Sequence, residues 1–565
     1  MDGRHEFTDE ELSGPVVDRR TTMKLLGAAG MAGLAGCTGG GGGSGGGGAN
    51  GSGSGGGSGG SAGSGSGGSG GKPQPGGRLS AGWFTGSVDT LDPPYISVGQ
   101  YFQVAANVFN GLVTLEKDLT VRGDLAKDWT VEDEGKSIRF TLREGVTFHN
   151  GTKFTAQDVQ YTIDRTISQD TPAASKLDTL KPLDQGGVKV NGDYEVELNF
   201  EKAMAPALIY LTRGPGRAAT IVNQEAIEEM GQEQYSITPV GIGPFQVTNH
   251  NVGSGITLDA FPEYFGTDED GTQLPYLDGI DIEPIPEPAT LVSALRGGDV
   301  DFSNLVPLQN VSQVEKAPEV KKLQAPGVNW YGFAMNQERD PFGSRKARLG
   351  IAKLINNEQF VETAYFGNAI AAQGPINKAT EWVWRENKPD IQSYAPEQGK
   401  QLIEEAGAAD ASFSILTTQD SLRPAKAMRQ QLTSRGFDVT VEQVTSSTYW
   451  ERYENLDYDT TISGSVGDPD PDQSLYNFYR SDGPWNWVSY ESQKADRLLA
   501  QQRRELDRDA RTKTLRKLED HLITDVPHAY LSHRDDIAAR RSNVRGFTHI
   551  PYMRNFHTVW LGEGP

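Results

Sequence analysis

Cysteine and histidine are scarce in this sequence. Its 565 residues include one Cys and eight His. A single cysteine excludes a disulfide framework, a cysteine-based zinc finger and an iron–sulfur cluster. The histidines are scattered, and His528 and His533, five residues apart, do not share one helical face as a zinc pair would. The sequence therefore predicts no metal site and no cofactor.

Positive charge is also in short supply. The chain has 53 Lys and Arg residues against 75 Asp and Glu residues, a net charge of −22. A nucleic-acid binder needs a basic face to neutralise phosphates, so this balance excludes that class. The acidic surplus favours a solvated, self-repelling surface, as in proteins that live in high salt.

The sequence also lacks a phosphate-binding loop. Gly135-Lys136-Ser137 has Thr130 where the motif needs its first glycine, so ATP hydrolysis is expected to belong to a partner. What the chain does have is material for large cores, with 36% hydrophobic and 9% aromatic residues. At about 100–200 residues per domain, the length predicts three or more structural lobes.

The N-terminal residues have the pattern of an export signal. The basic pair Arg19-Arg20 precedes an apolar run from Leu25 to Ala35. This run is too short for a membrane-spanning helix, which needs roughly 20 apolar residues. Positive charge, a short apolar run and small residues together indicate a signal peptide, and the paired arginines resemble a twin-arginine signal. The alternative is a chance basic pair.

The only cysteine lies directly after this run. Leu34-Ala35-Gly36-Cys37 resembles a lipobox, in which the cysteine carries the lipid of the mature protein. The alternative is an ordinary buried thiol, which does not explain its position. We therefore predict a twin-arginine lipoprotein signal over residues 1–36 and a lipidated Cys37. Residues 38–71 are almost pure Gly and Ser, so residues 37–77 are predicted to be a flexible tether.

From Arg78 onward the composition becomes mixed α/β. Alternation of Ile138, Phe140 and Leu142 with polar residues predicts a half-buried strand. Thr155 to Asp158 has the pattern of a capping box that begins a helix. Asn191-Gly192 between two strand-like segments predicts a hairpin.

A strand–helix–strand unit is predicted further along. Alternating apolar residues mark strands near 413–415 and 437–441, with a helix over Arg423 to Arg435 between them. A βαβ unit of this length implies a partly parallel sheet. Pro396 and Gly407 are predicted to bracket another helix.

Several motifs are more specific than these periodicities. The strongest are Asp124 to Trp129, Arg139 to Gly151, and Thr155 to Val159. The others are Leu91 to Pro93, Asn110 to Leu112, Pro239 to Phe245, Leu295 to Asp301, Phe333 to Asn336, Tyr394 to Gly407 and Asp468 to Asp472. In this order they closely resemble the family 5 extracellular solute-binding proteins, the dipeptide/oligopeptide-binding type that serves ABC importers.

The resemblance implies an α/β, two-lobed periplasmic-binding-protein-like fold of class II, the large three-domain type, with a hinge between the lobes. It places lobe I at residues 78–108, 240–322 and 536–565. An additional domain would occupy residues 109–239, and lobe II residues 323–535. A monomer is expected that captures a peptide or a similar small solute and delivers it to a permease heterodimer with cytoplasmic ATPases.

The resemblance also suggests binding residues. In peptide-binding relatives an aspartate of the Asp-Pro loop pairs with the ligand α-ammonium, and Asp468 matches it best, followed by Asp470. A desolvated ammonium needs such a charged partner. The alternative is that the alternating Asp-Pro residues form only a rigid acidic turn.

Backbone contacts with an extended ligand are expected at four positions. Gly464 and Ser465 lie on one candidate strand, and Ser97 and Val98 match the other backbone-contacting segment of the family. For Ser97 and Val98 an ordinary turn is the alternative. Oligopeptide binders carry an aromatic residue just before the Asp-Pro loop, and its absence here weighs against a peptide as the solute.

Tryptophans offer a different kind of site. Trp485 and Trp487 are placed on the same side of an extended segment, and Trp330 lies in the same predicted lobe. Such rings stack on sugar rings, flat cations or side chains, which would fit a saccharide. The alternative is that each ring belongs to the core.

Two other functional classes remain open from the sequence. An anchored extracellular hydrolase would need two carboxylates roughly 5–10 Å apart across a cleft, and nothing singles out such a pair among the acidic residues. A sensor that binds solute and signals is the second. We predict a non-enzymatic binding protein at the extracellular face of the cytoplasmic membrane.

Overall fold

The computed structural model of the chain describes residues 72–214, 217–467 and 469–563. The predictions for residues 1–71, Cys37 included, and for Asp468 lie outside this part. These described residues form one compact unit. Within the described residues, every helix is too short or too polar to cross a bilayer.

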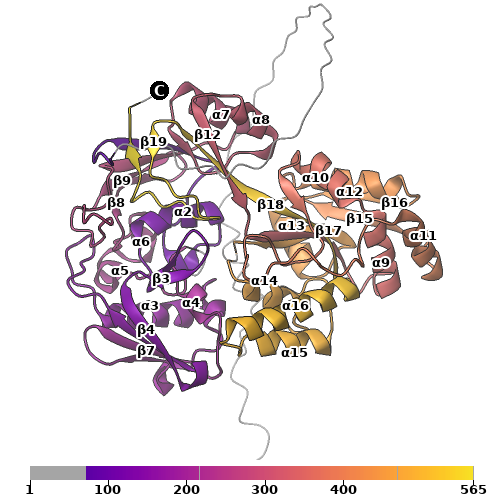
Figure 1. Cartoon of the computed structure of the whole chain (residues 1–565), viewed down its shortest axis with the longest axis horizontal. Helices are drawn as coiled ribbons and strands as arrows, with labels where there is room; N and C mark the ends of the chain where they lie inside the picture. Colours follow the sequence, from indigo (N-terminus) through magenta and orange to yellow (C-terminus); the bar gives the residue numbers. More distant parts are fainter. Residues whose placement is uncertain (1–71, 215–216, 468, 564–565) are drawn as a thin grey trace, which may run out of the picture. The chain divides into compact units, whose positions relative to one another are not determined.

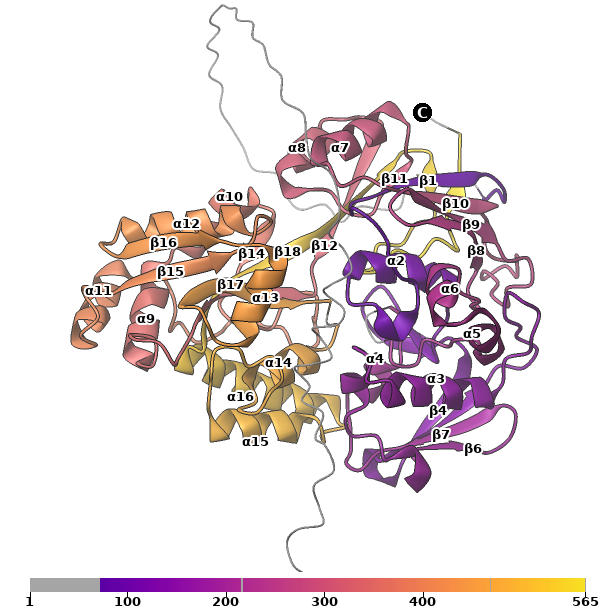
Figure 2. The same cartoon turned by 180° about the vertical axis from the view of Figure 1, so that it is seen from behind.

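One long strand connects the two lobes of this unit. β18 (His528–Arg541) pairs antiparallel with β12 (Val320–Pro326) from Asp535 to Arg541. Its earlier residues pair with β13 (Asn329–Met335) and, at Ser532 to Arg534, with β14 (Ala369–Ala371). Figures 1 and 2 show β18 running from one lobe into the other. The two lobes therefore share one hydrogen-bonded strand.

The first lobe is built on a mixed sheet. Its strands follow the order β11-β1-β10-β9-β8, and β1 is parallel to both β10 and β11. The strands are β1 (Arg78–Trp83), β8 (Phe245–Asn251), β9 (Gly255–Ala260), β10 (Gly279–Pro284) and β11 (Phe302–Ser303). The helices of this lobe are α2 (Gly99–Val108), α7 (Pro288–Gly297) and α8 (Val311–Glu315). Leu79, Ala81 and Trp83 of β1 are fully buried and form part of its core.

The second lobe contains the predicted βαβ unit. β15 (Ser412–Thr417) and β16 (Asp438–Gln443) are parallel, with α12 (Leu422–Thr433) between them, which confirms that prediction. β17 (Thr460–Val466) joins β15 to β13. The other helices are α9 (Arg345–Leu354), α10 (Asn357–Tyr365), α11 (Pro396–Glu405), α13 (Ser446–Glu454), α14 (Pro471–Tyr479), α15 (Gln493–Gln502) and α16 (Arg508–Asp525). α11 begins at Pro396 as predicted.

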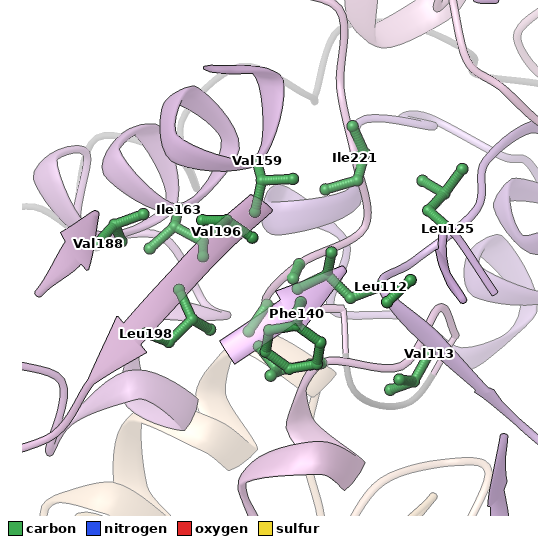
Figure 3. Close-up of a cluster of buried hydrophobic side chains, with 14 of the residues drawn as sticks. Leu112, Val113, Leu125, Phe140, Val159, Ile163, Val188, Val196, Leu198 and Ile221 are labelled. Atoms are coloured by element: carbon green, nitrogen blue, oxygen red, sulfur yellow. The ribbon is translucent and has the colours of Figure 1, made fainter. Parts of the chain in front are cut away.

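The third group of elements, which we call the additional domain, is an antiparallel sheet backed by a helix. The sheet order is β4 (Ala126–Glu132), β5 (Ser137–Leu142), β7 (Glu195–Asn199) and β6 (Val188–Val190). α3 (Ala156–Ser168) begins at the predicted capping box, because Thr155 and Asp158 bond reciprocally. The β6–β7 hairpin is also confirmed. Figure 3 shows Phe140 packed with side chains of this sheet and helix.

Shorter elements complete the chain. They are β2 (Val113–Leu115), β3 (Val121–Gly123), α4 (Ala207–Tyr210), α5 (Gln224–Met230), α6 (Gln232–Ile237), β19 (Val544–Arg545) and β20 (Trp560–Leu561).

The two-lobed α/β class predicted from the sequence is confirmed. The residue boundaries predicted for the lobes stay a prediction.

A buried charge network joins the additional domain to the second lobe. The Tyr210 hydroxyl donates to Asp472 Oδ2 at 2.6 Å, and Arg503 Nε lies 2.9 Å from Asp472 Oδ1. Arg503 also reaches Asp178 of the additional domain at 3.1 Å. Burial is the largest single influence on the Asp472 carboxyl and raises its pKa. The charge and hydrogen bonds of Arg503, together with Arg511 and Tyr210, outweigh burial, so the net pKa lies below its ordinary value.

Replacing this carboxylate should destabilise the fold strongly. Asp472→Asn is expected to lower the free energy of unfolding by about 3–5 kcal/mol, because it leaves the Arg503 charge buried and poorly paired. Asp482→Asn, which removes a carboxylate that is 80% exposed and paired with Arg480, should cost less than about 1 kcal/mol. Urea unfolding measures both, and equal losses would contradict the account.

The same carboxyl predicts a pH dependence. A group whose pKa is lowered by folding stabilises the protein above its unfolded pKa, and this stability is lost as pH falls through the folded pKa. Wild-type stability should therefore fall as pH drops below the ordinary Asp value of 3.8. Asp472→Asn lacks this contribution at every pH. The difference in the free energy of unfolding between the variant and the wild type should therefore become smaller in acid.

Candidate functional site

A cavity of about 280 Å³ lies where β18 passes from one lobe to the other. Gly99, Gln100 and Gln103 of α2 line it from the first lobe. Asn329 and Tyr331 of β13 line it from the second lobe. A larger cavity of about 530 Å³ is lined only by second-lobe residues between Ile355 and Tyr394. The smaller cavity is the candidate site because both lobes form its walls.

Arg534 brings to this cavity a positive charge that forms no ion pair with a described carboxylate. Its guanidinium lies 4.1 Å from the ring centroid of Tyr331 and 5.6 Å from that of Tyr365, and it donates to the Tyr331 hydroxyl. Among residues 72–214, 217–467 and 469–563, no carboxylate oxygen lies within ion-pair distance, 4.0 Å, of this group. The ring contacts orient the charge without neutralising it.

The backbone of Arg534 is fixed from β13. The Asn329 side chain donates to the Arg534 carbonyl at 2.7 Å and accepts from the Arg534 amide at 2.8 Å. This two-bond contact sits beside the point where β18 exchanges β13 and β14 for β12 as its partner. The position of Arg534 is therefore set by the register between the main chains of β13 and β18.

The neighbouring carboxylates differ in their environment. Asp536 Oδ1 accepts from Arg554 Nη2 at 2.6 Å and lies 2.9 Å from His549 Nε2. Burial raises the pKa of Asp536, but Arg554 and His549 outweigh burial and hold the pKa well below its usual value. Asp535 accepts from Gln324 at 2.6 Å, and burial raises its pKa. Asp535 is thus the less compensated of the two.

Tyr552 lies between the lobes at the edge of the cavity. Its amide donates to Asp536 Oδ2 at 2.6 Å, and its backbone has a φ of 69°. A Cβ added at Gly99 would lie 2.4 Å from its hydroxyl, and one added at Gly467 would lie 2.8 Å from its ring. Glycine at both positions lets the ring contact both lobes.

The predicted Asp-Pro loop, Asp468 to Asp472, comes next in the sequence. Asp468 lies outside the described residues, directly after the cavity-lining Gly467. Asp470 is buried, and Arg511 Nη1 and Nη2 bond its two carboxylate oxygens at 2.7 and 2.6 Å. Its side chain also accepts from the Asp472 amide and caps α14. The structure gives Asp470 a structural role, and ligand binding by it stays a prediction.

The predicted backbone-contacting residues lie near the cavity. Gly464 and Ser465 are on β17, opposite Tyr331 and Trp330 of β13. Ser97 and Val98 are exposed and directly precede the cavity-lining Gly99. Val98 is extended at the start of α2, with 40% of its surface exposed. Contact of these four residues with a ligand stays a prediction.

The tryptophans occupy a different part of the second lobe. Trp330 is 1% exposed and packs against Phe478 at 5.1 Å between ring centroids. Trp485 also packs on Phe478, and Trp487 packs on Tyr453 at 5.0 Å. None of the three is among the residues lining the 280 Å³ cavity. The structure thus places Trp330 in the core and leaves the other two half-buried.

The sequence placed Tyr331, beside Trp330, among the second-lobe aromatic residues that could contact a ligand, but it did not single out Arg534 or Tyr552. One signal was present, since Arg534-Asp535-Asp536 places three consecutive charges between the apolar residues Ala529 to Leu531 and Ile537 to Ala539. Reading that signal requires the register of β18, which links Arg534 to Tyr331 across 203 residues of sequence. Local patterns carry no information on this contact.

The chain was compared with known families and proteins. The family model of the bacterial extracellular solute-binding proteins, family 5, matches residues 120–486. The oligopeptide-binding protein AppA of Bacillus subtilis is 25% identical over 527 residues, 87% of this chain and 93% of that protein. The glutathione-binding protein GsiB of Escherichia coli K12 is 24% identical over 482 residues, 82% and 90% of the two chains.

Solved structures show the same fold. The periplasmic binding protein DppA of Helicobacter pylori, in complex with the peptide STSA, has a TM-score of 0.75 and 23% identity, covering 87% of this chain and 99% of that one. AppA of Bacillus subtilis in complex with a nonapeptide has a TM-score of 0.72 and 23% identity, with 87% and 100% covered. The family is one of solute-binding proteins and not of enzymes. This chain belongs to the bacterial extracellular solute-binding proteins, family 5.

Proposed function

We propose that this chain is the substrate-binding lipoprotein of an ABC importer, and that it binds a peptide or a similar carboxylate-bearing solute between its lobes. Family membership and a cavity walled by both lobes support this. The partner is a permease heterodimer with cytoplasmic ATPases. The solute binds the closed form more tightly than the open form and so stabilises the closed form. Only such a difference in affinity can shift the equilibrium between the two forms.

The observation that carries the proposal is the guanidinium of Arg534. It lines the cavity, is held by Tyr331 and Asn329, and lacks a carboxylate partner among the described residues. A guanidinium forms paired hydrogen bonds with a carboxylate, so the C-terminus of a peptide would supply the missing charge. AppA and DppA relatives bound to peptides and the glutathione-binding GsiB agree with such a solute.

Asp468 is the proposed partner of the opposite end of the solute. It follows Gly467 at the cavity edge, and a carboxylate there would pair with an α-ammonium. A saccharide is less well supported, because Trp330, Trp485 and Trp487 do not line the cavity.

The role of Arg534 predicts a specific loss of carboxylate recognition. Wild-type protein should bind a tripeptide at least about 10-fold more tightly than its C-terminal amide. Arg534→Gln should abolish this ratio, whereas Arg339→Gln, at an exposed second-lobe arginine paired with Asp457, should preserve it. Calorimetric titration measures the ratio, and an unchanged ratio in Arg534→Gln would refute the assignment.

Asp468 is tested at the other end of the same peptide. Asp468→Ala should weaken binding of the free-amine tripeptide by about 2 kcal/mol or more, roughly 30-fold, through loss of a buried charge pair. The N-acetylated tripeptide should bind wild type and variant alike. Equal binding of the free-amine peptide by both proteins would leave Asp468 without this role.

Anchoring to the membrane is the remaining part of the proposal. The paired Arg19-Arg20, the short apolar run and the lipobox-like Leu34 to Cys37 support export by the twin-arginine route and lipidation of Cys37. The Gly/Ser tether would then place the binding unit at the extracellular face of the cytoplasmic membrane.

Lipidation is tested by Cys37→Ser in the full chain. The variant should be released into the medium because it lacks the thiol that accepts the lipid, while Ser44→Ala in the tether should stay with the membrane. Immunoblots of membrane and medium fractions report the outcome. Retention of Cys37→Ser at the membrane would contradict the lipoprotein assignment.

A further inference from the structure

A second cavity of about 190 Å³ lies between the additional domain and the first lobe. It shares no lining residue with the cavity at β18. Its charged lining comprises three arginines, one aspartate and one histidine: Arg122, Arg143, Arg213, Asp124 and His557. Three guanidinium groups thus share a small cavity with one carboxylate.

Arg143 contributes a charge without an acidic partner. Its Nε donates to the Asp124 backbone carbonyl at 2.6 Å, and its guanidinium lies 5.4 Å from the ring centroid of Phe265. In the described part of the chain, Arg143 forms no ion pair with a carboxylate. Neither contact neutralises the charge, and Arg143 lines the cavity.

Arg213 is more deeply buried and is also poorly satisfied. Its side chain is 2% exposed, and its Nε lies 3.7 Å from Asp124 Oδ2, beyond hydrogen-bond length. This Nε is buried without a hydrogen-bond partner. A buried donor left unpaired destabilises the folded protein, so a ligand that accepts a hydrogen bond from it removes that cost.

Asp124 does not balance these charges. Its Oδ1 accepts from the Asn110 side chain at 2.5 Å, and its Oδ2 accepts from the Gly111 amide at 3.2 Å. The carboxylate is therefore engaged by neutral donors as well as by Arg213. Arg122, the most exposed of the three arginines, pairs with Glu116 outside the cavity at 2.5 Å.

His557 adds a second buried nitrogen without a hydrogen-bond partner among the described residues. Its Nδ1 is buried and has no hydrogen-bond partner. Burial, and after it the nearby charges of Arg213 and Arg122, lowers its pKa to about 3. The lining therefore combines unmatched positive charge with unsatisfied ring and guanidinium nitrogens.

We propose that this cavity binds a small oxyanion of the phosphate or sulfate class. Such an ion accepts several charge-assisted hydrogen bonds at once, which matches the donors of Arg143 and Arg213. A water molecule takes up about 30 Å³ of liquid, so the cavity has room for a tetrahedral oxyanion and a few waters. The bound ion would bridge Arg143 and Arg213 of the additional domain to His557 of the C-terminal segment.

The test is calorimetric titration of the full chain with inorganic phosphate and with sulfate at constant ionic strength. Wild type should bind one equivalent. Arg143→Gln should weaken binding at least 10-fold, because it removes a cavity charge from a half-buried side chain. Arg139→Gln is the matched control, since it removes the same charge from the same domain at an arginine paired with Glu132 and Glu195. It should bind phosphate within twofold of wild type.

Two further readouts separate site binding from general salt effects. Phosphate should raise the melting temperature of wild type and Arg139→Gln but not of Arg143→Gln, because a ligand of the folded state stabilises it. Phosphate should also raise the pKa of His557, measured by NMR. Tighter binding of glycerol 3-phosphate than of phosphate would support the site and identify an organic phosphate as its occupant.

The proposal fails if neither anion binds, or if Arg143→Gln binds as wild type does. Equal weakening in Arg143→Gln and Arg139→Gln would show non-specific charge screening and would also overturn it. Tripeptide binding at the β18 cavity should be unchanged in Arg143→Gln, so this result is independent of the proposed transport function.

Discussion

The pairing of β18 with strands of both lobes is the constraint on which the arrangement of the lobes depends. Its 14 residues bond to β13 and β14 of the second lobe and to β12 and β11 of the first. A register shift in this strand would move every side chain to the opposite face in both lobes. The pairing therefore fixes Arg534, Asp535 and Asp536 at the junction, and the candidate site is formed around them.

Local sequence patterns predicted the elements well. Three predicted features depend on residues that are close together in sequence, and all three were found as expected. They are the capping box at Thr155, the Asn191-Gly192 hairpin and the βαβ unit. The site was harder to predict, because its contacts join distant segments. Arg511, 41 residues away in sequence, forms hydrogen bonds with the Asp470 carboxylate. Trp330 is packed among Phe478 and other aromatic side chains that are remote in sequence. The family resemblance suggested ligand contact for Asp470, and residue type suggested it for Trp330.

The two candidate cavities differ in charge from the chain as a whole. The chain carries a net charge of −22, yet Arg534 at the lobe junction and Arg143 of the additional domain lack carboxylate partners among the described residues. Buried carboxylates such as Asp472 and Asp536 are by contrast paired with arginines. Unmatched charge is costly to bury, so positions where it persists identify groups that a ligand can complete.

The most direct test of the central claim is hydrogen exchange of the full chain with and without a saturating tripeptide. Binding between the lobes predicts slower exchange on both walls of the β18 cavity, at Gly99 to Gln103 in the first lobe and at Asn329 to Tyr331 in the second. Protection confined to one lobe would contradict the account. Protection at residues 355–394 alone would place the solute in the larger second-lobe cavity instead.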